Sequence, residues 1–285
     1  MGYRRALCLL VLALLSGCAA LRRPVIAESI PPYSHYVAMG SSFAAGPGVD
    51  TIEIGTPLRC TRSVSNYAHQ LAQQRNLRLT DVTCSGATTE HVLGPWRELP
   101  AQLDALRTDT RLVTLTIGGN DLGFMSGLIG ATCLSRGLQA RYPSSMCRPP
   151  AQPDQTTYDA LKSRLHEIVL EVRGRSPDAT LVFIDYATVL PARGRCEGAP
   201  LSDTDMKTLR LIDRRLRVLT EDTARQSGAL LVKAGLLTRA HHVCASDPWV
   251  NGFIMDDKEK SSSIYHPTHA AMTEIAAALD RLLAR

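Results

Sequence analysis

The sequence predicts a single α/β domain of three layers, in which a central parallel sheet of about five strands is flanked by helices on both faces. Apolar runs of strand length alternate with segments of helical periodicity along the chain, and we find no internal repeat and no second core. Short runs that are apolar throughout are typical of parallel strands, because helices cover both faces of such a sheet. We place this domain at residues 36–285.

The five expected strands are short and rich in apolar and β-branched residues. They cover residues 36–39, 77–84, 111–117, 180–184 and 229–232.

Segments with apolar residues three or four positions apart lie between and after these strands. They predict helices over residues 66–75 and 100–107, around 158–172 and 209–219, and over 272–283. Residues 122–156 are long for a loop in a compact domain, so we expect them to be locally structured or functional.

The first residues have the pattern of an export signal. Arg4 and Arg5 precede an apolar run over residues 6–15, which is too short to span a membrane comfortably. Leu15-Ser16-Gly17-Cys18 then resembles a bacterial lipobox, so we favour a lipoprotein signal peptide over 1–17 with a lipidated Cys18 as the first mature residue. Cleavage as an ordinary signal peptide, which would release a soluble secreted protein, is the alternative. Residues 18–35 contain Pro24 and the pair Pro31-Pro32, and we expect a tether there.

Composition narrows the partners that the mature protein can bind. The net charge of +5 is mild and the arginines are scattered, which argues against nucleic-acid binding. No C-x-x-C or H-E-x-x-H spacing is present, so neither a metal nor another cofactor is expected, and the pair His241-His242 fits a solvated or packing role. We expect a monomer.

The cysteines also agree with export. Six of them follow the expected signal peptide and Cys18, and an even number in an exported chain predicts three disulfides. Several connectivities are possible. We prefer sequential pairing, in which each pair would brace one loop region.

Four short stretches carry groups that are suited to acyl transfer. Gly40-Ser41-Ser42, Ser85-Gly86 and Gly118-Gly119-Asn120 each follow an expected strand, and Tyr265-His266-Pro267 precedes the last expected helix. Ligands of open α/β sheets bind beyond the carboxyl ends of the strands, so all four stretches can meet at one edge. Together they supply a nucleophile, a base and N–H donors for an oxyanion.

In this order, the four stretches resemble the sequence blocks of the SGNH (GDSL-like) hydrolase superfamily, and above all its secreted actinobacterial lipases and esterases. The resemblance spans roughly residues 34–284. It implies a flavodoxin-like SGNH fold and an ester hydrolase that needs no cofactor. It also implies the sequential disulfides Cys60–Cys84, Cys133–Cys147 and Cys196–Cys244.

The resemblance assigns a role to each block. Ser42 would be the nucleophile and His266 the base. The Ser42 and Gly86 backbone N–H groups and the Asn120 side chain would form the oxyanion hole. Independently of the resemblance, we assign Asp121 a structural role, as a carboxylate that orders its loop.

Two positions depart from the family pattern. Ser41 stands where the family block usually has aspartate, so local hydrogen bonding must differ there. Three residues before the histidine, many relatives have an aspartate that orients the imidazole, and this chain has Ser263. We predict that the Ser263 main-chain carbonyl orients His266, which gives a dyad; a carboxylate from Asp256 or Asp257 is the alternative.

The sequence therefore predicts an exported serine ester hydrolase, a lipase or esterase, that acts on lipid or small acyl esters and is anchored to a membrane by lipid. A carbohydrate O-acetyl esterase and a phospholipase are alternatives, because the same site accepts many leaving groups. A lipoprotein that binds lipid or cell-wall material through a disabled site is an alternative of another class. The segment 122–156 would either wall an acyl-binding groove beside Asn120 or serve as a structural cover.

Overall fold

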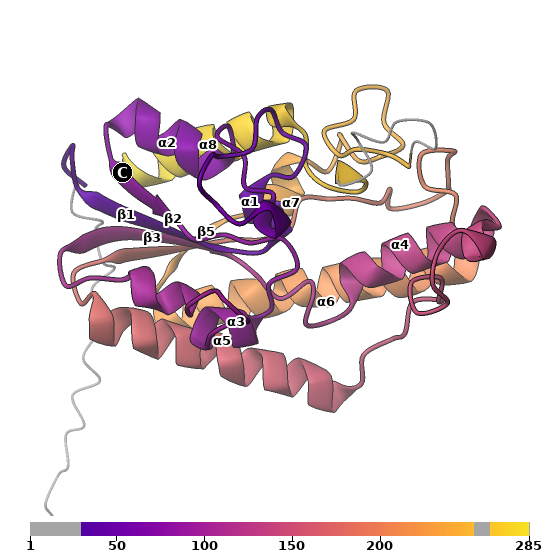
Figure 1. Cartoon of the computed structure of the whole chain (residues 1–285), viewed down its shortest axis with the longest axis horizontal. Coiled ribbons are helices and arrows are strands. Elements are labelled where there is room, and N and C mark those ends of the chain that lie inside the picture. Colours follow the sequence, from indigo (N-terminus) through magenta and orange to yellow (C-terminus); the bar gives the residue numbers. More distant parts are fainter. Residues whose placement is uncertain (1–29, 254–262, 285) are drawn as a thin grey trace, which may run out of the picture.

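The computed structural model describes residues 30–253 and 263–284 of the chain, and its centre is a five-stranded sheet (Figure 1). The strands are β1 (His35–Gly40), β2 (Arg78–Asp81), β3 (Thr110–Thr116), β4 (Thr180–Ile184) and β5 (Leu230–Val232). All neighbouring strands are parallel, in the order β2-β1-β3-β4-β5. The prediction of a three-layer α/β domain with a parallel sheet of about five strands is confirmed.

Helices cover both faces of the sheet (Figure 1). One face carries α2 (Tyr67–Arg75) and α8 (His269–Leu283), and the other carries α3 (Thr89–Leu93), α4 (Phe124–Ser135), α5 (Gln155–Arg175) and α6 (Asp203–Ser227). Two short helices, α1 (Ser42–Ala45) and α7 (Ala234–Leu237), follow β1 and β5 directly. Three 3-10 helices complete the described elements: η1 (Leu58–Cys60), η2 (Gln102–Ala105) and η3 (Leu138–Ala140).

The alternation of side chains along β1 divides the core into two parts. Val37 and Met39 belong to the larger buried cluster, which contains the apolar residues of α5 and α6. Tyr36 and Ala38 belong to the second cluster, with the apolar residues of α2 and α8. Both sets are completely buried, as expected for a strand covered on both faces.

Side-chain caps fix where the long helices begin. The Asn66 side chain accepts hydrogen bonds from two backbone N–H groups at the start of α2, and Asp154 and Ser202 each accept one at the starts of α5 and α6. Such a cap typically stabilises a helix by about 1 kcal/mol. Within the described residues, no helix is long and apolar enough to cross a membrane.

The register of the sheet brings the predicted stretches to one edge. Gly40 at the end of β1 is paired with Thr116 at the end of β3, so the residues that follow these two strands emerge side by side. Beyond the end of β2, the Cys84 N–H donates to the Gly40 carbonyl over 3.0 Å, which carries Ser85 and Gly86 to the same place. We call this edge the carboxyl edge of the sheet.

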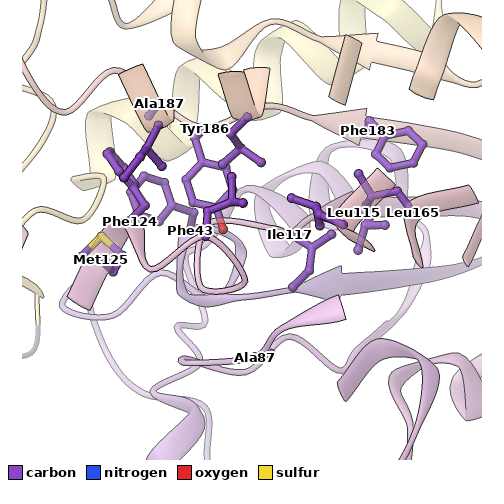
Figure 2. Close-up of a cluster of buried hydrophobic side chains, with 14 of the residues drawn as sticks. Phe43, Ala87, Leu115, Ile117, Phe124, Met125, Leu165, Phe183, Tyr186 and Ala187 are labelled. Atoms are coloured by element: carbon purple, nitrogen blue, oxygen red, sulfur yellow. The ribbon is translucent and has the colours of Figure 1, made fainter. Parts of the chain in front are cut away.

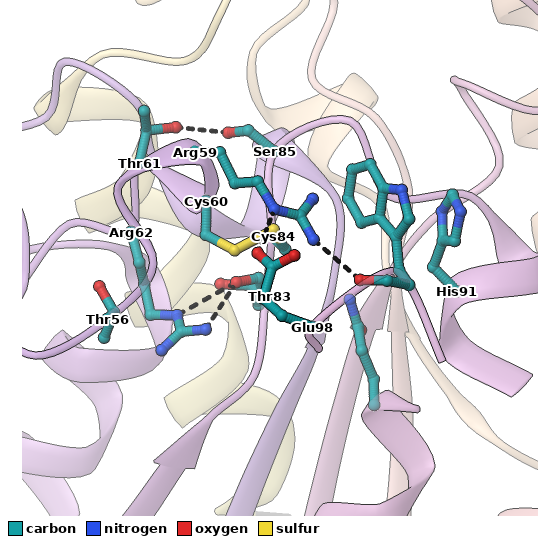
Figure 3. Close-up of a disulfide and its surroundings, with 12 residues drawn as sticks. Thr56, Arg59, Cys60, Thr61, Arg62, Thr83, Cys84, Ser85, His91 and Glu98 are labelled. Carbon is teal, nitrogen blue, oxygen red and sulfur yellow. Dashed lines mark hydrogen bonds and ion pairs between the residues drawn. A yellow bond between two sulfur atoms is a disulfide. The ribbon is translucent and has the colours of Figure 1, made fainter. Parts of the chain in front are cut away.

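The three predicted disulfides are all present: Cys60–Cys84, Cys133–Cys147 and Cys196–Cys244. The first joins η1 to the segment that leads to Gly86 (Figure 3). The second joins α4 to the segment after η3, and the third joins the loop after β4 to the loop after α7. Each one braces a connection between elements, as the sequential pairing predicted.

Some predicted boundaries were wrong. The expected helix over 100–107 is the short 3-10 helix η2, because the buried Gln102 side chain bonds both the N–H and the C=O of Gly40 and holds the segment against β1. Strand β2 is shorter than expected, and α8 begins at His269, after Pro267. Residues 122–156 are structured and contain α4 and η3.

The predicted tether over 18–35 also extends too far toward the domain. Ile30 is buried among residues of the second core cluster, and the Tyr33 N–H donates to the Asn76 carbonyl over 2.6 Å. An apolar side chain and backbone pairing thus attach residues 30–35 to the domain. The signal peptide over 1–17, Cys18 and the rest of the tether lie outside the described residues.

Candidate active site

The turn after β1 carries Ser41 and Ser42 at the carboxyl edge of the sheet. The Ser41 N–H donates to the Thr116 carbonyl over 2.9 Å, which holds the turn against the end of β3. Ser41 has extended backbone at the N-cap of α1, whereas Ser42 is the first residue of the helix. Both serines are buried within the protein, with Ser42 at 4% exposure.

His266 faces Ser42 directly. Its Nε2 lies 2.8 Å from Ser42 Oγ, and its Nδ1 lies 2.9 Å from the Ile264 carbonyl oxygen. A carbonyl can only accept, so Nδ1 carries the proton in this arrangement and Nε2 is left to accept the proton of Ser42. The predicted serine–histidine pair is therefore brought together by the fold.

The carbonyl that orients His266 is not the one predicted. The Ser263 carbonyl accepts the main-chain N–H of His266 over 2.9 Å and closes a turn, and the imidazole bonds the next carbonyl, that of Ile264. The prediction of main-chain orientation holds, but the residue was wrong. Asp256 and Asp257, the alternative partners, lie outside the described residues.

The loop that carries His266 is held by several contacts. Tyr265 has φ +63°, which is strained for a residue with a side chain, and it is completely buried. Its N–H donates to the Asn251 carbonyl over 2.9 Å, and the Asn251 N–H donates to the His266 carbonyl over 3.0 Å. The Tyr265 hydroxyl also lies 2.6 Å from Thr132 Oγ1 on α4. These bonds compensate for the strain and fix the imidazole.

Burial sets the charge of the histidine. His266 is 8% exposed, and burial lowers its pKa from 6.5 to about 4, although the bond to Ile264 acts in the opposite direction. The Phe43 ring, whose centroid is 5.4 Å from that of the imidazole, forms part of this apolar setting. The imidazole is therefore neutral near pH 7, the form in which it can accept a proton.

The other predicted groups converge on the same edge. One N–H of the Asn120 side chain donates to the Ala87 carbonyl over 2.9 Å, and an amide NH₂ group has a second N–H to offer. Among the described residues, neither the Ser42 nor the Gly86 backbone N–H has an acceptor. Gly86 has φ +85°, a conformation that favours glycine. These three donors are thus available to a ligand.

Asp121 connects two of these stretches. Its carboxylate accepts hydrogen bonds from the Thr89 N–H, with oxygens at 3.1 and 3.2 Å, and from the Thr89 hydroxyl. The loop that carries Asn120 is thereby joined to the segment that begins at Gly86. This is the loop-ordering role that we predicted for Asp121.

Two aromatic residues near the site were not predicted. The Tyr186 hydroxyl bonds Ser41 Oγ at 2.9 Å and accepts the Gly119 N–H at 3.0 Å. Trp96 lies beside Gly86, with its ring edge 3.3 Å from the position that a β-carbon would take there. Tyr186 follows the expected strand 180–184 by two residues, so the rule that places sites at strand ends offered a signal for it.

Trp96 is itself fixed on both sides. The Arg59 guanidinium lies 4.0 Å from its ring centroid, and the His91 ring stacks on it at 4.1 Å. Arg59 is held in turn by the Glu98 carboxylate and the Trp96 carbonyl (Figure 3). The Cys60–Cys84 disulfide lies in the same neighbourhood (Figure 3) and ties η1 to the segment that leads to Gly86.

Among the residues that the structure describes, no group of three or more histidine, cysteine, aspartate or glutamate side chains is placed to hold a metal ion. His241 stacks on Trp249 with ring centroids 3.7 Å apart, and its Nδ1 lies 2.8 Å from the Asp247 carbonyl. His241 therefore has the packing role that we expected.

A buried serine bonded to a neutral histidine, beside free N–H donors at the carboxyl edge of a parallel sheet, is the set of groups that acyl transfer through a serine requires. Comparison with known proteins agrees. The model of the GDSL-like lipase/acylhydrolase family matches residues 38–273, and the chain belongs to this family. The protein is accordingly an ester hydrolase with the SGNH fold.

Its relatives include lipases of Streptomyces. The chain is 35% identical to Lipase 2 of Streptomyces coelicolor over 223 residues, which cover 75% of this chain and 74% of the relative. It is 28% identical to a lipase of Streptomyces rimosus over 264 residues, covering 90% and 87% of the two chains. These similarities confirm the predicted resemblance to actinobacterial lipases.

Solved structures show the same fold. Phospholipase A1 from Streptomyces albidoflavus superposes with a TM-score of 0.70 at 25% identity, covering 87% of this chain and 99% of that one. An acetylxylan esterase from Geobacillus stearothermophilus matches with a TM-score of 0.52 at 14% identity, over 90% and 97% of the chains, and shows the fold alone.

Proposed function

We propose that this protein hydrolyses acyl esters with Ser42 as nucleophile and His266 as general base, in a dyad oriented by the Ile264 carbonyl. The observation that carries the proposal is the 2.8 Å contact between Ser42 Oγ and His266 Nε2. Ser41 cannot take the place of Ser42, because it is completely buried and its hydroxyl is bonded to Tyr186. The geometry around Ser41 therefore gives no support to the alternative of a lipoprotein with a disabled site.

The reaction proceeds in two halves. Ser42 Oγ attacks the ester carbonyl while His266 Nε2 takes its proton, and the tetrahedral intermediate collapses as Nε2 passes that proton to the leaving alcohol. Water then attacks the acyl-enzyme, gives one proton to Nε2, and expels Ser42, which recovers the proton as the carboxylic acid departs. Throughout, the Ile264 carbonyl accepts the hydrogen bond from Nδ1–H and stabilises the transient imidazolium.

Three donors would hold the oxyanion in both halves. They are the Ser42 N–H, the Gly86 N–H and the second N–H of the Asn120 side chain, whose first N–H is fixed by Ala87. Loss of one such donor typically lowers the rate by about 10²- to 10³-fold.

The experiment is hydrolysis of p-nitrophenyl esters by the purified protein and by Ser42→Ala. We expect turnover by the wild type and its loss in the variant, with an unchanged melting temperature. Activity that survives in Ser42→Ala would contradict the assignment, and an inert wild-type protein would favour the binding lipoprotein.

We propose further that the acyl chain of the substrate lies in a groove walled by the segment 122–156. The groove has a volume of about 600 Å³, and its lining includes Asp121, the residue after Asn120. Such a volume is ordinary for a ligand site. Its lining is mainly apolar and includes Leu122, Ile129, Met146, Pro149, Pro150 and Pro153.

Ser126 on α4 lines this groove and is exposed, so Ser126→Trp would fill it without disturbing the core. We expect the variant to lose hydrolysis of a palmitate ester while a butyrate ester is hydrolysed at the wild-type rate. If both rates are unchanged, the segment is a structural cover.

Parallel assays with a phospholipid and with acetylated xylan test the two alternative substrate classes.

Finally, we propose that the protein is exported and anchored by lipid at Cys18, with ordinary secretion as the alternative. The Arg4-Arg5 pair, the apolar run and the Leu15-Ser16-Gly17-Cys18 motif support this, as do three disulfides, which persist in oxidising compartments. Mass spectrometry of the N-terminal peptide from membranes tests it. Diacylglyceryl on Cys18 is expected, and a soluble mature chain without lipid would contradict the anchor.

A further inference from the structure

Tyr186 occupies a central place between the two loops that carry the proposed catalytic groups. It follows the last residue of β4 by two positions and is 1% exposed. Its ring packs on Phe43, with centroids 4.4 Å apart, and forms a T-shaped contact with the Phe124 ring, with centroids 6.4 Å apart (Figure 2). The apolar contacts fix the direction of the ring and therefore the position of its hydroxyl.

That hydroxyl joins two particular backbone segments. It lies 2.9 Å from Ser41 Oγ and accepts the Gly119 N–H over 3.0 Å. Ser41 immediately precedes Ser42, and Gly119 immediately precedes Asn120. One oxygen atom thus links the residue before the proposed nucleophile to the residue before the proposed oxyanion donor.

The Tyr186 hydroxyl is closely packed against Gly119 and Ser41. A β-carbon at Gly119 would lie only 2.7 Å from the Tyr186 hydroxyl oxygen, so the two groups approach as closely as a glycine allows. Burial raises the pKa of Tyr186 to about 12, and the phenol consequently keeps its proton throughout the neutral range. The Ser41 side chain is short and completely buried, and its hydroxyl is hydrogen-bonded to the Tyr186 hydroxyl.

We propose that Tyr186 is a positioning residue, whose hydroxyl fixes the spacing between Ser42 and the Asn120 side chain so that both engage the same ester carbonyl. The proposal rests on the function proposed above. A misplacement of about 1 Å at a catalytic group can lower a rate by about 10²-fold. Loss of a hydrogen bond one residue away from Ser42 and from Asn120 can therefore shift either group enough to lower kcat. The same bond gives Ser41, which stands at the family's aspartate position, a defined partner.

The test is Tyr186→Phe, which keeps the ring and removes the hydroxyl. We expect kcat to fall by about 10- to 100-fold while KM stays within about threefold, because the spacing of groups that act in the transition state is altered. Tyr36→Phe is the matched control. Tyr36 is also completely buried and its hydroxyl bonds one threonine, Thr114, at 2.8 Å, away from the catalytic loops. It should lower the melting temperature but leave kcat within about twofold.

Double variants separate positioning from general destabilisation. In an Asn120→Ala background the amide donor is already missing, so Tyr186→Phe should lower kcat much less than it does in the wild type. Ser41→Ala breaks the same link from the other side and should lower kcat in the same direction, which keeps the test open if Tyr186→Phe does not fold. Its effect should be smaller, because the Gly119 N–H keeps its acceptor.

Equal kcat values for Tyr186→Phe and Tyr36→Phe would overturn the proposal, and so would full additivity with Asn120→Ala. Failure of the proposed function has a different signature. In that case the wild-type protein is inactive, or Ser42→Ala retains the wild-type rate.

Discussion

The charge of His266 makes a quantitative prediction about pH. Acidification protonates the imidazole, and the protonated form cannot accept the Ser42 proton. Because burial lowers the pKa of His266 from 6.5 to about 4, kcat/KM should be half-maximal near pH 4 and flat through the neutral range. The assay is kcat/KM for a soluble ester between about pH 3 and pH 8, with folding followed by circular dichroism at each pH. An acid limb centred near 6.5 would mean that water reaches the imidazole, and it would refute the account of a desolvated base.

The same shift affects stability, with a sign that follows from linkage. Between pH 6.5 and about 4 the unfolded chain binds a proton at His266 that the folded chain does not, so the free energy of unfolding falls as the pH falls through that range. The full shift corresponds to about 3 kcal/mol, all of it present above pH 6.5.

Comparison with a variant isolates this contribution. Buried carboxylates also titrate in the acid range, because burial raises the pKa of Asp185 to about 6 and that of Asp213 to about 7. Subtracting the urea-unfolding profile of His266→Gln from that of the wild type cancels them. Parallel profiles of the two proteins would contradict the predicted contribution.

Three further predictions concern the donors and the disulfide near them. Asn120→Ala should lower kcat by about 10²- to 10³-fold with little change in melting temperature, and a drop below about tenfold in steady-state assays would exclude it as a main oxyanion donor. Gly86→Ala places a β-carbon on a residue with φ +85°, 3.3 Å from the Trp96 ring, so both kcat and the melting temperature should fall. A wild-type melting temperature in calorimetry would be inconsistent with this. Replacing Cys60 and Cys84 by alanine opens a loop of sequence separation 24 and should reduce the free energy of unfolding by about 2–4 kcal/mol. The value of kcat should also fall, because the segment that carries Gly86 is no longer tied to η1. An unchanged urea midpoint would argue against a bracing role.

The sequence was most informative where the pattern is local. Apolar runs located the strands, and the rule that sites lie beyond strand carboxyl ends placed Ser42, Gly86 and Asn120 at one edge, where the structure has them. The cysteine pairs were predictable for a similar reason, since each pair braces one connection.

The rest depended on tertiary geometry. The choice between the Ser263 and Ile264 carbonyls is decided by the left-handed backbone of Tyr265, which no residue type in that stretch announces. The sequence predicts a helix around Gln102, because the hydrogen bonds of its side chain to Gly40 join residues far apart in the chain. The end of the strand 180–184 pointed to the neighbourhood of Tyr186, but its contact with Ser41, 145 residues away in the chain, could not be predicted from sequence spacing.

The central claim, that Ser42 is the nucleophile activated by His266, is tested most directly by labelling with a fluorophosphonate. The probe reacts with an activated serine, and peptide mapping by mass spectrometry then locates the adduct. We predict a single adduct on Ser42, with labelling lost in Ser42→Ala and strongly slowed in His266→Gln. An adduct on Ser41, or undiminished labelling of Ser42→Ala, would contradict the account.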